Sequence, residues 1–282
     1  LEYGGWERRA RKRWRVFPHA VCRRGTFATS GGAVGMMRLF SATLLSLLLC
    51  ASLANAAEKP LIVASDATWP PIEMLDENKN VVGYSIDYLK AVAKEAGLNV
   101  EFRNTAWDGI FAALESRQAD IIASSVTITD KRKKAMLFTD PYYESGLMTI
   151  VRKDNTVIHS LADLKGKRIG VQLGTTGAQE AEKIEGAKVT NFDTSDLACL
   201  ELKNGNVDAV ISDLPVLEYF LKKGGASYAK TVGTPKKGDF YGIAAPKGKK
   251  ELIDGLNKAL KELKDSGEYQ KIHDKWFGAE TK

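Results

Sequence analysis

The feature of this sequence that most constrains its fold is a regular alternation of strand and helix patterns after residue 60. The segment Leu61–Ser65 is a short apolar strand, and Ser85–Ala96 repeats its apolar residues with helical spacing. Gly97 follows and is expected to end that helix. Strands that alternate with helices of this length are typical of βαβ units with mainly parallel sheets, so the sequence predicts an α/β fold.

The same alternation continues to the end of the chain. Further strands are predicted at residues 100–102, 120–124, 168–172, 188–192 and 208–211. Further helices are predicted at residues 107–114, 177–184, 195–203, 214–222, 249–263 and 268–276. The apolar fraction of 44% is sufficient for packed cores in a chain of 282 residues, which is long enough for about two modest domains.

The positive charge of the chain is concentrated at its N-terminal end. Nine of the 41 Lys and Arg residues, but only two of the 35 Asp and Glu residues, occur up to Ala56. The remainder therefore carries 32 basic and 33 acidic residues and is close to neutral. A nucleic-acid-binding surface would need a basic stripe, so the charge pattern disfavours that function for the globular part.

Residues 36–56 have the three parts of a secretory signal peptide. Met36-Met37-Arg38 is followed by an apolar run and then by Ala54-Asn55-Ala56, an A-x-A cleavage site. We expect cleavage after Ala56 and a periplasmic mature chain. A short anchor helix is an alternative, but the run of about 15 residues is short for a membrane span. A lipoprotein would use Cys50, although Leu49 is large for the position before a lipidated cysteine.

Residues 1–35 are rich in Arg and Trp and have no sustained period. We interpret them as an untranslated or disordered extension upstream of a start at Met36 or Met37. A basic arm that binds nucleic acid is the alternative. After cleavage Cys199 is the sole cysteine, so no internal disulfide is expected. The histidines are scattered, and neither a metal site nor a cofactor is predicted.

Six segments, in a fixed order, carry a resemblance to a known family. They are Asp66–Glu73 (DATWPPIE) with Gly83–Asp87 (GYSID), Trp107–Leu114 (WDGIFAAL), Asp120–Arg132 (DIIASSVTITDKR), Phe138–Tyr143 (FTDPYY), Leu164–Thr176 (LKGKRIGVQLGTT) and Asp208–Asp213 (DAVISD). Over nearly the whole mature chain the sequence resembles the polar amino-acid binding proteins of bacterial extracellular solute-binding protein family 3. Binding proteins for lysine, arginine and ornithine and for glutamine belong to this family.

The resemblance implies a type II periplasmic binding protein fold with two α/β lobes, each a mainly parallel sheet flanked by helices. Two crossover strands would join the lobes, and the ligand would bind in the cleft between them. Lobe one is expected at residues 57–146 and 240–282, and lobe two at residues 147–239. The resemblance also implies a monomer.

A free amino acid carries a carboxylate and an ammonium, so its site needs a fixed cation and a fixed anion. Arg132 suits the carboxylate, because its planar fork grips both oxygens. From spacing alone, a solvated residue of the basic run Lys131–Lys134 is the favoured interpretation; the family's T-x-x-R context favours the ligand role instead. Asp213 suits the ammonium. Its position before a helix favours an N-cap, whereas the resemblance favours the ligand contact, and both roles are compatible.

Hydroxyl residues are expected to complete the amino-acid clamp, the set of side chains that binds the carboxylate and the ammonium of the ligand. Ser124, Ser125 and Thr127 follow a strand, at the end where α/β sheets place their ligands. Thr175 and Thr176 lie at a strand-to-helix turn after Gly174, where backbone N–H groups favour an anion. No Gly-Lys-Ser/Thr follows, so this turn is not a nucleotide-binding loop.

Trp69 and Trp107 match aromatic positions of the family and would sandwich the stem of the ligand side chain. Aromatic faces attract cations by roughly 0.5–2 kcal/mol. Asp66, three residues before Trp69, is expected to reach the distal end of the ligand. Two tryptophans and a carboxylate favour a basic ligand, such as arginine, lysine, histidine or ornithine. If Asp66 instead binds a backbone group or a neutral amide, the ligand would be glutamine or another neutral polar amino acid.

Other functions on this fold are disfavoured. An enzyme similar to cyclohexadienyl dehydratase would need a general acid in the cleft, and no catalytic residue is identified beyond the clamp. The sensing domain of a receptor would need a membrane span, and the mature chain has no apolar run of that length. We therefore expect a binding protein without enzymatic activity. Its partners would be a free amino acid and the membrane permease of an ABC transporter, and not nucleic acid.

Overall fold

The computed structural model describes residues 59–278. The predicted extension (1–35) and signal peptide (36–56) lie outside the described residues. Within them, most strands belong to two five-stranded mixed sheets. We call the sheet that contains β1 the lobe-one sheet and the sheet that contains β9 the lobe-two sheet.

The lobe-one sheet has the strand order β5-β1-β6-β13-β7. β1 pairs in parallel with β5 and β6, whereas β13 pairs antiparallel with β6 and β7. The strands are β1 (Leu61–Ser65), β5 (Val100–Asn104), β6 (Ile121–Ile122), β7 (Met136–Phe138) and β13 (Ala244–Pro246).

The lobe-two sheet repeats this scheme with the order β10-β9-β11-β8-β12. β9 pairs in parallel with β10 and β11, and β8 pairs antiparallel with β11 and β12. The strands are β8 (Tyr143–Arg152), β9 (Arg168–Gln172), β10 (Lys188–Phe192), β11 (Ala209–Asp213) and β12 (Ala229–Tyr241).

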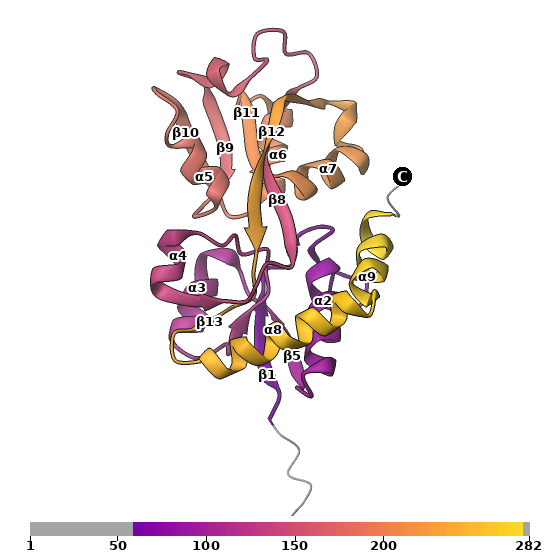
Figure 1. Ribbon diagram of the computed structural model, residues 1–282. Helices are drawn as coiled ribbons and strands as arrows, with labels where there is room; N and C mark the ends of the chain where they lie inside the picture. The colour runs from indigo at the N-terminus through magenta and orange to yellow at the C-terminus, as the bar shows by residue number, and fades with distance from the viewer. Residues whose placement is uncertain (1–58, 279–282) are drawn as a thin grey trace, which may run out of the picture. The chain divides into compact units, whose positions relative to one another are not determined.

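Helices connect and cover the strands (Figure 1). They are α2 (Tyr84–Glu95), α3 (Trp107–Glu115), α4 (Asp130–Ala135), α5 (Thr176–Ala181), α6 (Ser195–Asn204), α7 (Leu214–Lys222), α8 (Lys250–Asp265) and α9 (Glu268–Phe277). Short 3₁₀ turns occupy Leu161–Leu164 and Gly225–Ser227. A small antiparallel sheet follows β1 and consists of β2 (Thr68–Trp69), β3 (Glu73–Leu75) and β4 (Val81–Val82).

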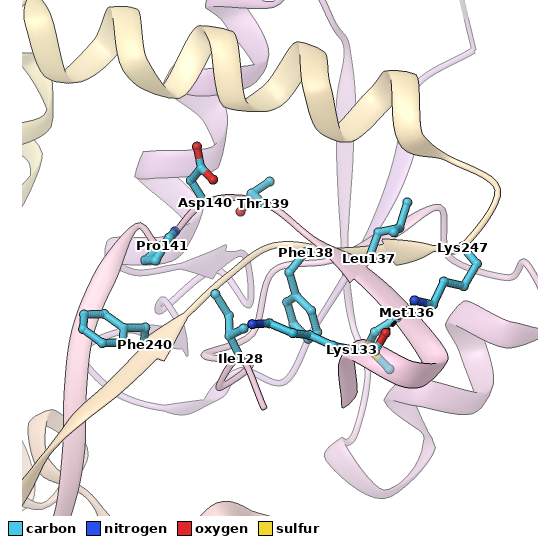
Figure 2. A pocket seen from close by; sticks show the side chains of 10 residues that line it. All are labelled: Ile128, Lys133, Met136, Leu137, Phe138, Thr139, Asp140, Pro141, Phe240 and Lys247. Carbon is cyan, nitrogen blue, oxygen red and sulfur yellow. Dashed lines mark hydrogen bonds between the residues drawn. The ribbon is translucent and has the colours of Figure 1, made fainter. Parts of the chain in front are cut away.

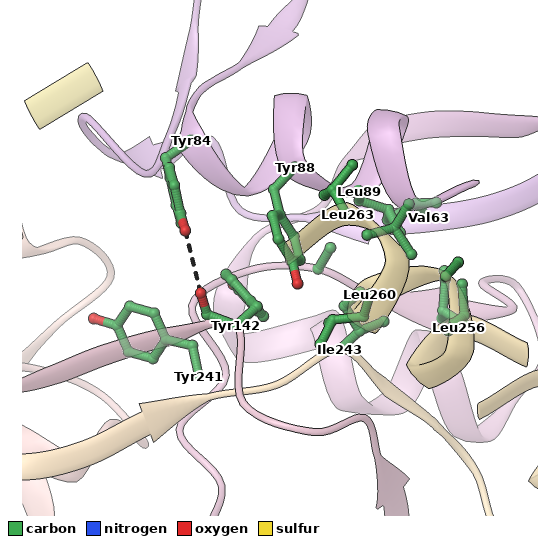
Figure 3. Packing of buried hydrophobic residues seen from close by; sticks show 14 of the residues in the cluster. Val63, Tyr84, Tyr88, Leu89, Tyr142, Tyr241, Ile243, Leu256, Leu260 and Leu263 are labelled. Carbon is green, nitrogen blue, oxygen red and sulfur yellow. Dashed lines mark hydrogen bonds between the residues drawn. The ribbon is translucent and has the colours of Figure 1, made fainter. Parts of the chain in front are cut away.

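Each large sheet has a hydrophobic core on both faces, because successive strand residues point to opposite sides. In β1, Val63 belongs to the core under α2 and α8, whereas Ile62 and Ala64 belong to the core under α3. Figure 3 shows the first of these cores, in which the leucines of α8 pack against tyrosines of α2. The Tyr84 hydroxyl donates to the Tyr142 carbonyl at 3.1 Å, so this large side chain is satisfied within the core.

β8 and β12 run antiparallel to each other and link the two large sheets (Figure 1). Their backbones approach so closely at Gly146 that a Cβ there would lie 2.0 Å from the Lys236 carbonyl oxygen. The register shifts twice in β12, between Val232 and Lys236 and between Lys237 and Asp239. The expected lobe boundaries at residues 146 and 239 fall inside these two strands, where irregular pairing makes a bend easiest.

The α/β prediction is confirmed, and every predicted strand and helix is present. The ends of β1, β9, β10 and α7 are as predicted, and those of the other predicted elements are shifted. The sheets are mixed, because β8 and β13 join them antiparallel. The apolar patterns did not predict α4, β7, β13 or the small sheet. They also did not predict β8 and β12, since the buried and exposed residues of these strands do not follow a simple apolar period; crossover strands were expected from the resemblance alone. Within the described residues, no helix has the length and apolar character needed to cross a bilayer.

Candidate functional site

Seven of the ten predicted site residues lie at the carboxyl ends of four parallel strands. Asp66 follows β1, and Ser124 to Thr127 follow the neighbouring strand β6. In the lobe-two sheet, Thr175 and Thr176 follow β9, and Asp213 ends the neighbouring strand β11. Polar side chains at adjacent carboxyl ends of parallel strands form the usual ligand-binding edge of an α/β sheet.

Arg132 is placed by the short helix α4. The Thr129 side chain caps this helix and accepts from the Arg132 backbone N–H at 3.2 Å. The T-x-x-R spacing is therefore that of an N-cap and the third helical residue. The Arg132 guanidinium lies over the rings of Trp107 and Phe111, 5.3 Å from each centroid.

Within the described part of the chain, the guanidinium of Arg132 donates only to backbone carbonyls, to Thr127 at 3.0 Å and to Gly174 at 3.4 Å. Gly174 belongs to the β9–α5 turn, so this second contact joins the two lobes. Burial lowers the pKa of Arg132 to about 10, against the opposing effect of Asp213 and Asp239. No carboxylate among residues 59–278 forms an ion pair with it, so its charge is available to an anion.

Asp213 is 2% exposed and is oriented by Tyr241. The Tyr241 hydroxyl donates to Oδ2 at 2.6 Å, and Oδ1 is buried with no partner among the described residues. Although Asp213 precedes α7, its side chain makes no capping hydrogen bond. Burial raises its pKa to about 7, while the Tyr241 hydrogen bond lowers it. An unpaired buried carboxylate oxygen is a strong acceptor for a cation.

Asp66 is the second buried carboxylate of the site, also 2% exposed. Its Oδ1 accepts from the Thr68 hydroxyl at 2.9 Å and its Oδ2 from the Gln172 amide at 3.2 Å. Gln172 ends β9, so this bond also joins the two lobes. Burial raises the pKa of Asp66, and the two hydrogen bonds lower it. Both side chains that donate to Asp66 are neutral, so its carboxylate has no counter-ion among the residues that the structure describes.

The hydroxyl residues divide by what they contact. The Ser124 hydroxyl accepts from the Asp66 N–H at 2.8 Å, and Ser125 donates to Glu73. Thr175 caps α5 by accepting from the Ala178 N–H at 3.1 Å and donates to the Gln172 carbonyl at 2.8 Å. These hydroxyls therefore hold the loops in shape. Thr176, the first residue of α5, is partly exposed. The roles of all these residues toward a ligand stay predictions.

Trp69 and Trp107 lie beside each other, with ring centroids 6.1 Å apart and ring planes 36° from parallel. Both are nearly buried, and Trp69 Nε1 has no hydrogen-bond partner in the part of the chain that the structure describes. A methylene chain between two aromatic faces needs about 7–8 Å, twice a normal carbon contact. The two rings are closer than this, so together they form one aromatic wall. That they sandwich the stem of the ligand side chain stays a prediction.

Three residues of the site were missed by the sequence analysis. Glu73 is fully buried and binds Ser125, Tyr241 binds Asp213, and Gln172 binds Asp66. Glu73 and Gln172 lie within two of the motifs named in the sequence analysis. The available signal for Glu73 was a charged residue close after the Pro70-Pro71 turn. Tyr241 is far from Asp213 in the sequence and gave none.

A pocket of about 530 Å³ lies elsewhere in lobe one (Figure 2). It is formed by the segment Met136–Pro141 with Ile128, Lys133, Phe240 and Lys247. None of the predicted ligand-binding residues lines it. A smaller pocket of about 250 Å³ does reach the site, since Arg132, Phe111, Gly174 and Gln179 line it from both lobes. Among residues 59–278 no group of His, Cys, Asp and Glu side chains could hold a metal ion.

Residues 61–279 match the family model of the bacterial extracellular solute-binding proteins, family 3. The chain is 39% identical over 222 residues to the "Probable histidine-binding protein" of Neisseria gonorrhoeae, which covers 77% of this chain and 83% of the relative. It is 37% identical over 228 residues to "ABC transporter arginine-binding protein 1" of Escherichia coli K12, covering 79% and 93% of the two chains.

A solved structure described as "an ancestral arginine-binding protein bound to arginine" superposes with a TM-score of 0.75 at 46% identity. The match covers 78% of this chain and 98% of the ancestral protein. The predicted two-lobe α/β fold is therefore confirmed, as is the resemblance on which it was based.

Proposed function

The chain belongs to the bacterial extracellular solute-binding proteins of family 3, and we propose that it captures a free basic amino acid for an ABC transporter. The observation that carries this proposal is the charge balance of the site. Two buried carboxyl groups, Asp66 and Asp213, accompany one guanidinium, Arg132, and no two of the three form an ion pair. A third buried carboxyl group, Glu73, is mostly uncharged at pH 7, because burial raises its pKa to about 8. A basic amino acid carries two cationic groups and one carboxylate, which complements this set.

Each charge of the ligand then has a partner. Arg132 binds the α-carboxylate, because a guanidinium without an ion pair matches a carboxylate with two parallel hydrogen bonds. The free Oδ1 of Asp213 accepts from the α-ammonium. Asp66 binds the cationic end of the side chain, and the wall of Trp69 and Trp107 contacts its stem. A neutral ligand such as glutamine would leave the Asp66 carboxylate without a counter-ion.

Binding is coupled to closure of the two lobes. Asp66 and Arg132 belong to lobe one, Asp213 belongs to lobe two, and the ligand bridges them. The Gln172–Asp66 and Arg132–Gly174 hydrogen bonds form only when the carboxyl ends of the two sheets meet. A ligand shifts the open–closed equilibrium by its difference in affinity for the two states. We propose that the closed form delivers the amino acid from the periplasm to the permease, and that the chain acts as a monomer without catalysis.

Calorimetric titration with arginine, lysine, ornithine, histidine and glutamine tests this proposal. At least one basic amino acid is expected to bind ten or more times more tightly than glutamine. Replacing Asp66 with Asn should reduce that preference about 10- to 100-fold, since it removes the counter-ion of the side chain. Asp108→Asn is the matched control: its carboxylate is exposed near the site and should change the preference less than about threefold.

Two outcomes would overturn the proposal. Equal or tighter binding of glutamine would discard the basic ligand and keep the α-amino-acid clamp. Turnover of prephenate without binding of any amino acid would replace the transport function with an enzymatic one.

A further inference from the structure

A pocket of about 290 Å³, separate from the candidate site, is lined by both lobes and by both crossover strands, β8 and β12. Lobe one contributes Tyr269 and His273 from α9, and lobe two contributes Leu214 at the start of α7. The crossover strands contribute residues 143–145 of β8 and Lys237 of β12. We call this space the rear pocket.

The rear pocket and the candidate site lie on opposite sides of the crossover strands. Arg132 in α4 donates to the carbonyl of Gly174, just before α5, so these two helices meet at the candidate site. Figure 1 shows α4 and α5 on one side of β8 and β12, and α7 and α9 on the other. The crossover strands therefore separate the candidate site from the rear pocket.

Each wall of the rear pocket is fixed to its own lobe. In α9, Ile272 belongs to the lobe-one core, and Trp276 Nε1 donates to Asp87 of α2 at 2.8 Å. In α7, Leu217 is fully buried in the core of lobe two. The two walls therefore move with their lobes.

The crossover strands are irregular beside this pocket. The register of β12 against β8 shifts between Lys237 and Asp239, and Lys237 lines the pocket. Irregular pairing makes a bend easiest at this level. A rotation here that separates α4 from α5 must bring α7 closer to α9, because the two pairs of helices lie on opposite sides of the axis.

The lobes meet at the candidate site in this structure, through the Gln172–Asp66 and Arg132–Gly174 hydrogen bonds. The rear pocket is thus present when the lobes are closed. Opening of the candidate site would consume the space in the rear pocket.

We propose that the rear pocket limits how far the lobes open, and that His273 determines ligand affinity although it lies outside the candidate site. Added bulk at this position would meet α7 in the open form and raise its free energy. The closed form has room for the same bulk. A ligand that binds the closed form then has a smaller cost of closure to offset, so its affinity rises.

His273→Trp and His273→Ala test the proposal with opposite expected signs. The tryptophan should tighten the binding of L-arginine about 3- to 30-fold, and the alanine should weaken it about threefold or more. Each factor should be the same for L-lysine, because the pocket acts on the lobes and not on the ligand. Small-angle scattering without ligand should show a more closed ensemble for His273→Trp and a more open one for His273→Ala.

Lys271→Trp is the matched control. Lys271 lies on the opposite face of α9 from His273 and does not line the pocket. Its exposed ion pair with Glu268 contributes little to stability. This variant should change neither the affinity nor the scattering.

Affinity changes of the same sign in the two His273 variants would overturn the proposal, because a purely structural role predicts a loss in both. Unchanged scattering of both ligand-free variants would overturn it as well. If neither variant folds, Lys237→Trp fills the same pocket from an exposed position of β12. It should tighten arginine binding, and weaker binding would contradict the proposal.

This inference rests on the proposed function for its ligand and not for its effect on the lobes. Failure of the proposed function is therefore distinguishable. The unmodified protein would then bind no amino acid, while the scattering of the ligand-free His273 variants would still differ in the expected directions.

Discussion

Tyr241 donates its hydroxyl to Oδ2 of Asp213 at 2.6 Å, and the same hydroxyl accepts from Ser145 at 2.9 Å. Tyr241 ends β12 and Ser145 lies in β8, so both crossover strands support the carboxylate of lobe two. The chain that joins the lobes is thus bonded directly to the proposed ammonium-binding group.

This relationship predicts a pH-dependent affinity. The pKa of Asp213 is raised to about 7 by burial, and a bound ammonium would lower it by direct attraction. Binding near pH 7 should therefore release protons from the protein. The affinity should fall as the pH falls below about 7, by at most about tenfold per pH unit, and level off above it. Titration calorimetry in buffers of different ionisation enthalpy measures the released protons.

Tyr241→Phe tests the cause of this behaviour. The Tyr241 hydrogen bond lowers the pKa of Asp213, so its loss should raise that pKa further. The affinity of the variant at pH 7 should fall several-fold and recover at higher pH. A uniform loss at every pH would contradict the assignment of the titration to Asp213.

Replacement of Arg132 should abolish recognition of the α-carboxylate. Arg132→Ala is expected to weaken arginine binding about 100-fold or more, since it leaves a buried carboxylate without its partner. Arg132→Lys keeps the charge but loses the fork, so an intermediate loss of about tenfold is expected. Agmatine, which is arginine without the carboxylate, is the control ligand, and its binding should not weaken in either variant. A parallel loss of agmatine binding would contradict the assignment.

The Gln172–Asp66 hydrogen bond is expected to stabilise the closed lobes. Gln172→Leu preserves the volume of the side chain but removes its donors to Asp66 and to the Asp193 carbonyl. The affinity for arginine should fall about tenfold, the effect of one hydrogen bond to a charged group. Small-angle scattering should show a more open ensemble. Gln118→Leu, at an exposed position, is the control. An unchanged ensemble in Gln172→Leu would show that the Gln172–Asp66 hydrogen bond does not stabilise the closed lobes.

Gly146 is expected to be essential for the pairing of the crossover strands. A methyl group at this position would lie 2.0 Å from the Lys236 carbonyl oxygen, so the strands must separate. Gly146→Ala should lower the free energy of unfolding by about 1–3 kcal/mol, as overpacking does elsewhere. Urea unfolding measures this change in the free energy of unfolding.

Gly255→Ala is the opposite case. Gly255 is an exposed residue of α8, and nothing lies within 4 Å of a Cβ there. Its replacement should raise stability by about 0.5–1 kcal/mol. Similar stability changes in the two variants would show that the contact at Gly146 relaxes without cost.

Much of the fold was predictable because its signals are local. Apolar runs and helical spacing identified β1, β9 and α2, since each of these elements buries residues at a regular period. The short strand β6 was predicted too long, because it contributes only two residues to the ladder before the Ser124–Thr127 loop leaves the sheet. The strands β8 and β12 gave no such signal, because β8 is buried at seven consecutive residues and β12 is mostly exposed, so neither alternates between buried and exposed residues.

The sequence by itself determined the α/β class and the family, because alternating patterns and motif spacing are properties of neighbouring residues; the ligand-binding residues that it indicates stay predictions. Only the tertiary structure decided which hydroxyls are already bonded and which charges have no partner. Tyr241 meets Asp213, Gln172 meets Asp66 and Glu73 meets Ser125 across 28, 106 and 52 positions of the chain. Such contacts depend on how the sheets and loops pack together, and no local pattern encodes a hydrogen bond between elements that meet only in the folded protein.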